Sequence, residues 1–275
     1  MLKLPFVCVA MSFSALAAPS SAHEFWIEPL GYMLSPGDTL EATIKVGTEF
    51  EGSSYAYLPT NFRRFDLTTG GETAPVPGRI GDRPAVQVPV EEPGLTTLIH
   101  VTRDYELTWE TWQKFEDFVD HKDGAGVLDT HRAQYEEADG VREVYSRYGK
   151  SLVAVGEGAG QDQEYGLTTE IVALENPYTG DLSDGFDIRV LYDGAPRADE
   201  QVEIFARNAT DEVTITTTRT NADGVATIDV APDTEYLLDS VVFREPADDL
   251  NPDFAPQWET LWASLTFHTP GAAMN

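Results

Sequence analysis

The sequence predicts a mainly β protein made of two immunoglobulin-like β-sandwich domains with a short helical insertion between them. Short segments of alternating apolar residues, separated by Gly, Pro, Asn and Asp, occur before residue 103 and again after residue 165. Between these regions, apolar residues recur every three to four positions, which is typical of helices. The content of hydrophobic residues, 41%, is sufficient for a buried core.

Residues 1–22 have the composition of a secretory signal peptide. Lys3 precedes an apolar stretch, and the small residues Ser20 and Ala22 match a cleavage site after Ala22. A second A-x-A sequence ends at Ala17 and gives an alternative cleavage site. Either site predicts a periplasmic protein. The mature chain has no apolar segment long enough for a transmembrane helix, so we expect no membrane insertion.

The first predicted β-sandwich domain covers residues 23–103. A turn at Ser35-Pro36-Gly37-Asp38 precedes residues 39–46, in which every second residue is apolar. Residues 86–90 alternate in the same way, and a Pro-Gly turn leads into a further strand over residues 95–102. This spacing of strands and turns predicts a small sandwich.

Residues 104–155 are predicted to form a helical insertion packed on the first domain. Apolar and aromatic side chains follow helical spacing in three runs, over residues 109–119, 128–135 and 141–152. Glycines at positions 124, 126 and 140 separate these runs. We therefore expect two or three short helices.

Residues 165–275 are predicted to form the second immunoglobulin-like domain and a C-terminal segment. Alternating strands are expected over residues 186–190, 202–206 and 225–230. The two β regions also resemble each other, and their similarity suggests a tandem of related units. The segments that can be laid side by side are residues 36–47 with 183–194, and residues 93–100 with 232–239.

Composition excludes several classes of function. The formal net charge of −29 makes nucleic acid and anionic lipid poor partners, because both would be repelled. Cys8 is the only cysteine and lies in the leader, so a mature metal site must use nitrogen and oxygen ligands, which favours Cu(II), Ni(II) or Zn. No nucleophile elbow, Walker loop, dinucleotide fingerprint or H-E-x-x-H motif occurs, so no catalytic residues are predicted.

The predicted metal ligands are led by His23. Cleavage after Ala22 would free its α-amine, which could bind one ion together with the imidazole at neutral pH. His100 lies inside an apolar strand and would complete a three-nitrogen histidine brace that suits Cu(II), although a hydrogen-bonded core histidine is the alternative. Asp239, which the alignment places beside His100, and His268 are the remaining candidates.

Several segments occur in an order that resembles a large bacterial family of exported proteins of unknown function. They are the leader followed by HEFWIEP at 23–29, KVG at 45–47, VYSRYGK at 144–150, ENP at 175–177 and LWASLTF at 261–267. That family is often labelled as a periplasmic component of nickel or cobalt uptake. The resemblance implies a periplasmic protein of two β domains, with His23 and His100 as the positions that bind metal.

The sequence therefore predicts a soluble periplasmic protein, not an enzyme, that binds Ni(II), Co(II) or Cu(II) and delivers it to a membrane transporter. One alternative is a metal-free tandem immunoglobulin-like module that recognises protein or carbohydrate. Its contact residues would be Trp109, Trp112, Trp258 and Trp262. A second alternative is a copper enzyme of oxidative type, since a histidine brace can activate oxygen.

Overall fold

The computed structural model describes residues 23–248 and 250–271 of the chain. The leader and its two candidate cleavage sites lie outside these residues. The described chain is mainly β, with two short α-helices and the 3-10 turn η1 (Pro59–Asn61). None of its helices is long and apolar enough to cross a membrane.

The first part of the chain contains ten strands around the helices. They are β1 (Glu24–Pro29), β2 (Met33–Leu34), β3 (Asp38–Thr48), β4 (Glu51–Tyr55), β5 (Phe62–Thr69), β6 (Glu72–Pro75), β7 (Val86–Val90), β8 (Gly94–Thr102), β9 (Tyr105–Thr108) and β10 (Arg142–Val155). The second part contains β11 (Thr169–Ala173), β12 (Phe186–Tyr192), β13 (Ala195–Pro196), β14 (Gln201–Asn208), β15 (Val213–Arg219), β16 (Val225–Ile228), β17 (Thr234–Arg244) and β18 (Trp258–Thr269).

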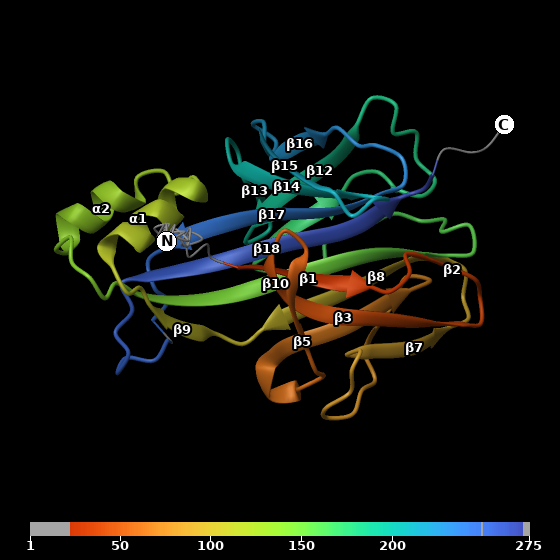
Figure 1. Cartoon of the computed structure of the whole chain (residues 1–275), viewed down its shortest axis with the longest axis horizontal. Helices are drawn as coiled ribbons and strands as arrows, with labels where there is room; N and C mark the ends of the chain where they lie inside the picture. The colour runs from red at the N-terminus through yellow and green to blue at the C-terminus, as the bar shows by residue number, and fades with distance from the viewer. Residues whose placement is uncertain (1–22, 249, 272–275) are drawn as a thin grey trace, which may run out of the picture.

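These strands form one large sheet and two small ones (Figure 1). The large sheet has the order β15-β14-β17-β18-β10-β8-β5-β6, and β2 and β9 also pair with β10. One small sheet has β3 at its centre, paired with β1, β4 and β7, and the other has β12, paired with β11, β13 and β16. Residues that the sequence assigned to two domains therefore share the large sheet.

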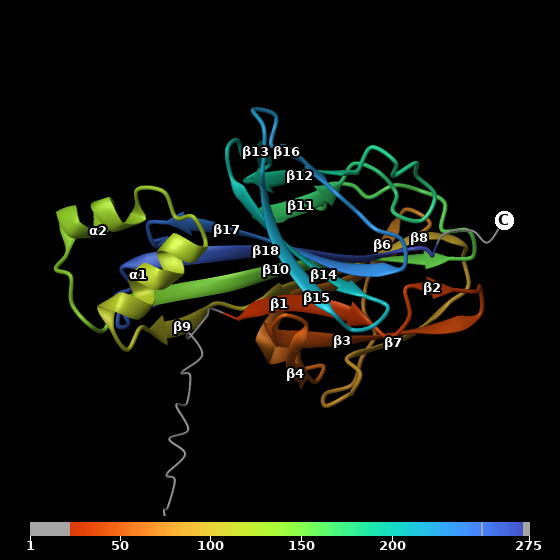
Figure 2. The ribbon, with the colours of Figure 1, turned by 45° about the horizontal axis from the view of Figure 1, so that its top comes forward.

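The topology repeats, as the similarity of the two β regions suggested. Strands β5, β6, β8 and β10 in one half of the large sheet correspond to β14, β15, β17 and β18 in the other half, in mirrored order. The halves meet where β10 and β18 run parallel, through the middle of the molecule (Figure 2). Leu152 of β10 packs in the core under β12, and its neighbour Val153 packs in the core under β3. The small sheets thus cover opposite faces of the large one.

Alternation fixes which residues enter each core. Leu40 and Ala42 of β3 are buried, as are Phe186 and Ile188 of β12. The alignment of residues 36–47 with 183–194 places the buried Leu40 beside Asp187, which is only partly buried. The buried residues of β12 are its two neighbours, Phe186 and Ile188. That alignment is wrong by one residue, because a shift of one position exchanges the two faces of a strand.

Of the two or three predicted helices, the third does not form, because its residues belong to β10. Val141, Tyr145, Tyr148 and Leu152 have helical spacing, yet residues 142–155 pair with β18 and β8. The later part of β10 is buried continuously because it contacts both β1 and β11, which lie on opposite faces. A strand covered on both faces loses the alternation that would identify it.

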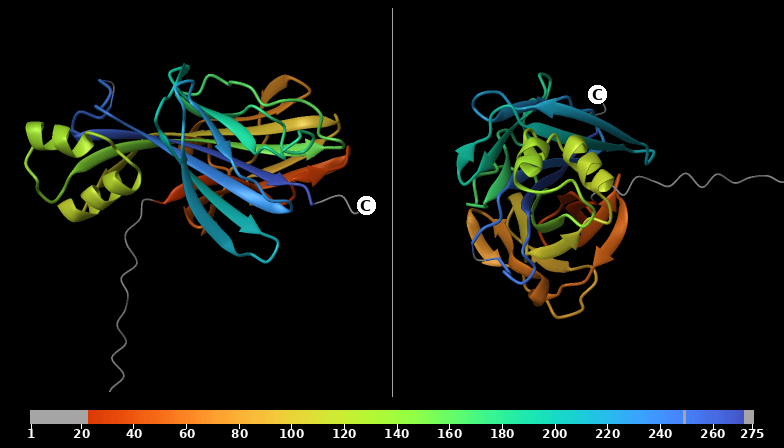
Figure 3. Two further views of the ribbon diagram at one scale, coloured as in Figure 1. Left: turned by 90° about the horizontal axis from the view of Figure 1, so that it is seen from above. Right: turned by 90° about the vertical axis from the view of Figure 1, so that its left-hand side faces the viewer.

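The two helices are α1 (Trp112–His121) and α2 (Val127–Gln134), and they lie at one end of the molecule (Figure 3). Thr111 caps α1 by accepting a hydrogen bond from the backbone N–H of Lys114. The helix packs on strands of the second repeat, since the ring centre of Phe118 lies 5.6 Å from that of Trp262 and 5.2 Å from that of Phe243. Within the predicted insertion, the helices therefore pack on strands of the second repeat, whereas residues 142–155 pair with β8 of the predicted first domain.

This packing also corrects the role expected for the tryptophans. Trp109, Trp258 and Trp262 are at most 5% exposed and belong to one apolar cluster with Phe115 and Phe118. Trp112 is half-buried at the edge of the same cluster. These side chains hold the insertion on the large sheet and offer little contact surface to a partner.

Candidate functional site at the His23 end

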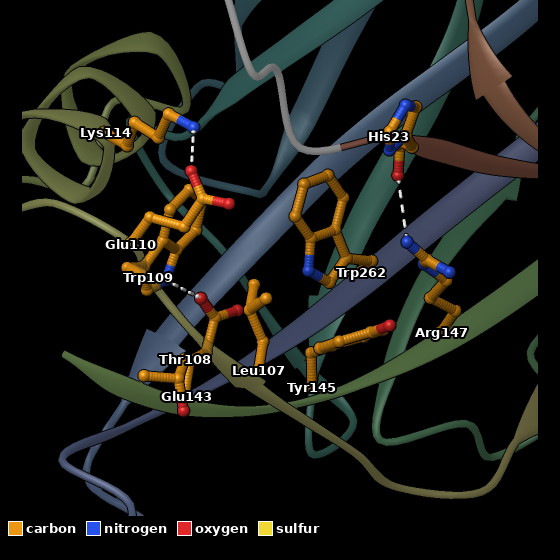
Figure 4. A pocket seen from close by; sticks show the side chains of 10 residues that line it. All are labelled: His23, Leu107, Thr108, Trp109, Glu110, Lys114, Glu143, Tyr145, Arg147 and Trp262. Carbon is orange, nitrogen blue, oxygen red and sulfur yellow. Dashed lines mark hydrogen bonds and ion pairs between the residues drawn. The ribbon is translucent and has the colours of Figure 1, made fainter. Parts of the chain in front are cut away.

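A cleft of about 300 Å³ opens where the described chain begins, beside β9, β10, β18 and the helical insertion. Figure 4 shows its lining, with aromatic rings between charged groups of both signs. Lys114 is paired with Glu110 at 2.5 Å on one side of the cleft, and His23 lies near Arg147 on the other. The lining residues are His23, Leu107, Thr108, Trp109, Glu110, Lys114, Glu143, Tyr145, Arg147 and Trp262.

Arg147 is the cation that binds the first described residue, His23, in this cleft. Its Nη2 donates a hydrogen bond of 3.0 Å to the backbone carbonyl of His23, and its guanidinium carbon lies 4.8 Å from the ring centre of Tyr145. Its Nε is buried and has no hydrogen-bond partner among the described residues. Since a buried donor without a partner costs free energy, Arg147 is suited to bind an acceptor from a ligand.

A second pocket, of about 170 Å³, shares Tyr145 and Arg147 with the cleft and contains His100. The His100 ring lies 4.8 Å from Phe65, 5.2 Å from Phe25 and 5.4 Å from Phe62, measured between ring centres. Burial lowers the pKa of His100 to about 3, so the imidazole is neutral at pH 7. Its Nδ1 is buried without a partner among the described residues.

Glu143 lies in the cleft without a cation bound to it. The indole N–H of Trp109 donates to Glu143 at 2.7 Å, and the hydroxyl of Thr260 donates to the other carboxylate oxygen. Burial raises the pKa of Glu143 to about 7, against which these two hydrogen bonds act. The cleft therefore contains a carboxyl group whose charge changes close to neutral pH.

The structure does not bring the four predicted metal ligands together. His23 is exposed at the rim of the cleft, whereas His100 belongs to the second pocket. Asp239 is buried and lies 2.9 Å from the Nζ of Lys122. His268 lies in another pocket, with its ring stacked on Tyr32. Within residues 23–248 and 250–271, no group of three or more His, Cys, Asp or Glu side chains is placed to hold a metal ion.

Lys122 explains why Asp239 is not a free ligand, and sequence reasoning missed it. Its Nζ lies 2.5 Å from Glu203, 2.9 Å from Asp239 and 3.5 Å from Glu24, and 4.9 Å from the ring centre of Trp262. Burial acts to lower the pKa of Lys122, but the three carboxylates outweigh it and raise that pKa. The lysine ammonium therefore occupies the centre of the acidic group in which Asp239 lies.

The fold and the cleft define a mainly β protein, in which a small sheet covers each face of one large sheet and a ligand-sized cleft opens at one end. The chain belongs to the DUF4198 family, which is described as a domain of unknown function and whose model matches residues 20–243. This confirms that the resemblance in the sequence points to a family of unknown function. That description does not mention nickel or cobalt.

A search of curated proteins gave no match. Among solved structures, the D0-D1 domain of intimin matches with 11% identity and a TM-score of 0.20, over 88% of this chain and 97% of that one. Dimeric latent PorU from Porphyromonas gingivalis matches with 11% identity and a TM-score of 0.19, over 88% of this chain and 20% of that one. TM-scores of this size define neither a shared fold nor a shared function.

Proposed function

We propose that the protein binds a divalent transition metal at its mature N-terminus, in the periplasm, and passes it to a membrane uptake system. The observation that carries this proposal is the position of His23. Its side chain is exposed at the rim of the cleft, and its backbone carbonyl is bound by Arg147. In this proposal His23 is the first residue of the mature chain, and that residue is held by its backbone while its imidazole is accessible.

The chemistry of His23 supports a chelate made by one residue. After cleavage at Ala22, the α-amine and the imidazole would provide two nitrogen donors to one ion. The net charge of −29 attracts cations to the surface as a whole. Nitrogen donors of this kind bind Cu(II) more tightly than Ni(II), and Ni(II) more tightly than Co(II).

The protein offers few further ligands at this place. Glu143 and Glu110 also line the cleft, but Glu143 accepts hydrogen bonds from Trp109 and Thr260, and Glu110 is paired with Lys114. Water or a small acid brought with the ion would then complete the coordination of the metal. A site of this kind releases its metal more easily than a site closed by protein ligands alone. Easy release is suited to delivery.

The proposal is tested by titrating the protein that begins at His23 with Cu(II) and Ni(II) in a calorimeter. We expect one ion per chain and at least about tenfold weaker binding after His23→Ala. A protein with Gly-Ser placed before His23 keeps the imidazole but loses the chelate, and its affinity should fall similarly. His268→Ala, at a different pocket, is the matched control. Unchanged binding after His23→Ala would refute the proposal.

A second candidate function is the recognition of a small organic ligand without metal. It is favoured by the two buried nitrogens that have no partner among the described residues, Nε of Arg147 and Nδ1 of His100, both on side chains that line the second pocket. An aromatic carboxylate such as benzoate has the apolar ring and the acceptor oxygens for this environment. Binding of benzoate that is lost in Arg147→Gln, in metal-free buffer, would support this function over metal binding.

A further inference from the structure

A second buried lysine, Lys150 of β10, lies between two acids away from the cleft. Its Nζ is 2.7 Å from Asp162 Oδ2 and 3.1 Å from Glu170 Oε1, and all three side chains are at most 1% exposed. The Nζ also lies 3.3 Å from the carbonyl of Gln163 and 5.0 Å from the ring centre of Tyr165. An amine and a carboxyl group are thus held in contact in a place that excludes water.

Asp162 is fixed as the closer of the two acids. It lies on the connection between β10 and β11, and its Oδ2 accepts a 2.9 Å hydrogen bond from the backbone N–H of Ala173. Its Oδ1 is buried and has no partner among the described residues. The carboxyl group therefore has one oxygen that is held in place and one that is available to accept a proton.

Glu170 belongs to β11, and its carboxylate is held next to the Nζ of Lys150. Its carboxylate accepts hydrogen bonds from the backbone N–H groups of Tyr165, at 3.0 and 3.1 Å, and of Leu167, at 3.2 Å. These bonds fix its oxygens beside the Nζ of Lys150. A carboxylate in this position can accept a proton from the amine and return it to a leaving group.

We propose that Lys150 and Asp162 become joined by an intramolecular isopeptide bond, with Glu170 as the group that transfers protons. In the dry site, the Lys150 ammonium gives a proton to the Asp162 carboxylate, which yields a neutral amine and a carboxylic acid. The amine nitrogen then attacks Cγ of Asp162. Glu170 takes a proton from the attacking nitrogen and delivers it to the departing hydroxyl, and the C–O bond breaks.

The products of this reaction are one amide and one water molecule, and Glu170 ends in its starting state. No oxidant, reductant or further reactant is required. Two features of the site favour the reaction, namely the fixed contact between the reacting groups and the exclusion of the water that would reverse it. A desolvated lysine is also a known form of activated nucleophile.

Lys122 shows why contact alone is not enough. Its Nζ also lies 2.9 Å from an aspartate, Asp239, but Glu203 and Glu24 surround the same ammonium. Three carboxylates hold the proton on Lys122, so its nitrogen has no free electron pair with which to attack. Lys122 and Asp239 therefore provide an internal control that should stay unlinked.

The test is the mass of the metal-free protein that begins at His23, measured under denaturing conditions. We expect a mass below that of the sequence by one water molecule. Digestion after glutamate cuts at Glu157 and separates Lys150 from Asp162, so linked peptides 144–157 and 158–164 should remain together. Peptides that contain Lys122 and Asp239 should be found separately.

Variants assign the roles of the three residues. Lys150→Met and Asp162→Ala should restore the full mass, and Glu170→Gln should slow or abolish bond formation while both reacting groups are kept. Asp162→Asn should still react but release ammonia in place of water, so its mass should fall below that of its own sequence by one ammonia and equal the mass of the linked wild type. A wild-type protein at its full sequence mass, with peptides 144–157 and 158–164 unlinked, would overturn the proposal regardless of how the variants fold.

Discussion

The two buried lysines stand in different electrostatic surroundings. Lys122 follows helix α1 and meets three acids, from β1, β14 and β17, whereas Lys150 lies within β10 and meets two. Around Lys122 the acids exceed the cation, and the pKa of Glu24 is raised to about 7, first by burial and then by the charges of Asp239 and Glu203. Acids also outnumber the cation at Lys150, so the two clusters differ in the number of carboxylates beyond the first, two at Lys122 and one at Lys150. The comparison teaches that this number sets how strongly the ammonium charge is held.

The largest effect on stability is expected from removing Lys122, the cation of the cluster with three acids. Lys122→Met keeps the length of the side chain but leaves Glu24, Glu203 and Asp239 buried without a positive charge. We expect a loss of about 3–5 kcal/mol in the free energy of unfolding at pH 7, measured by urea denaturation. Lys114→Met, which breaks an exposed ion pair, should cost less than about 0.5 kcal/mol. Similar losses in both variants would contradict this comparison.

A smaller effect is expected at Glu143, a buried acid whose carboxylate is in no ion pair among the described residues and on which the charge of Arg147 acts from a distance. Its pKa of about 7 in the folded protein exceeds the ordinary value of 4.5, so its protonation stabilises the fold at low pH. This contribution is lost as the pH rises from about 4.5 through 7. Glu143→Gln cannot ionise, and from pH 5 to pH 8 it should therefore gain up to about 3 kcal/mol relative to wild type.

The readout for Glu143→Gln is urea denaturation at a series of pH values. Glu110 lines the same cleft but is exposed, so Glu110→Gln is the control and should follow the pH profile of wild type. A Glu143→Gln profile that runs parallel to wild type over this range would show that Glu143 is ionised throughout.

The smallest effect is expected at His121, on the rim of the Lys122 cluster. Its Nε2 lies 3.0 Å from Glu203, and this hydrogen bond raises the pKa of His121. The stabilisation is complete below the ordinary pKa and is lost as the pH rises through the raised one. Because the side chain is 54% exposed, we expect His121→Ala to cost under about 0.5 kcal/mol at pH 6, and less at pH 8. A greater loss of stability at pH 8 than at pH 6 would contradict a raised pKa of His121.

Alternation in the sequence was a reliable guide where one face of a strand is buried. Residues 39–46 lie within β3 and residues 86–90 form β7, as predicted. The same argument placed His100 on the face opposite Ile99 and Val101, and those two side chains do pack in a different cluster from the rings around His100. It failed at residues 141–152, because β10 is covered on both faces.

The candidate site was predictable only in part. The sequence predicts a cleavage site directly before His23, but nothing in it showed that Arg147 binds the His23 carbonyl. Lys150 could have been found, because it is a charged residue inside an apolar run over residues 148–155. Lys122 gave no such signal, since it follows an acidic helix end and has the pattern of a solvated side chain.

The central place of β18 has a consequence for how the molecule is made. This strand is the last in the sequence, yet it lies between β17 and β10 in the middle of the large sheet. A nascent chain that stops before residue 258 presents two half-sheets with unpaired edges facing each other. The two half-sheets can therefore join only after nearly the complete polypeptide has been synthesised, since β18 supplies the strand between them.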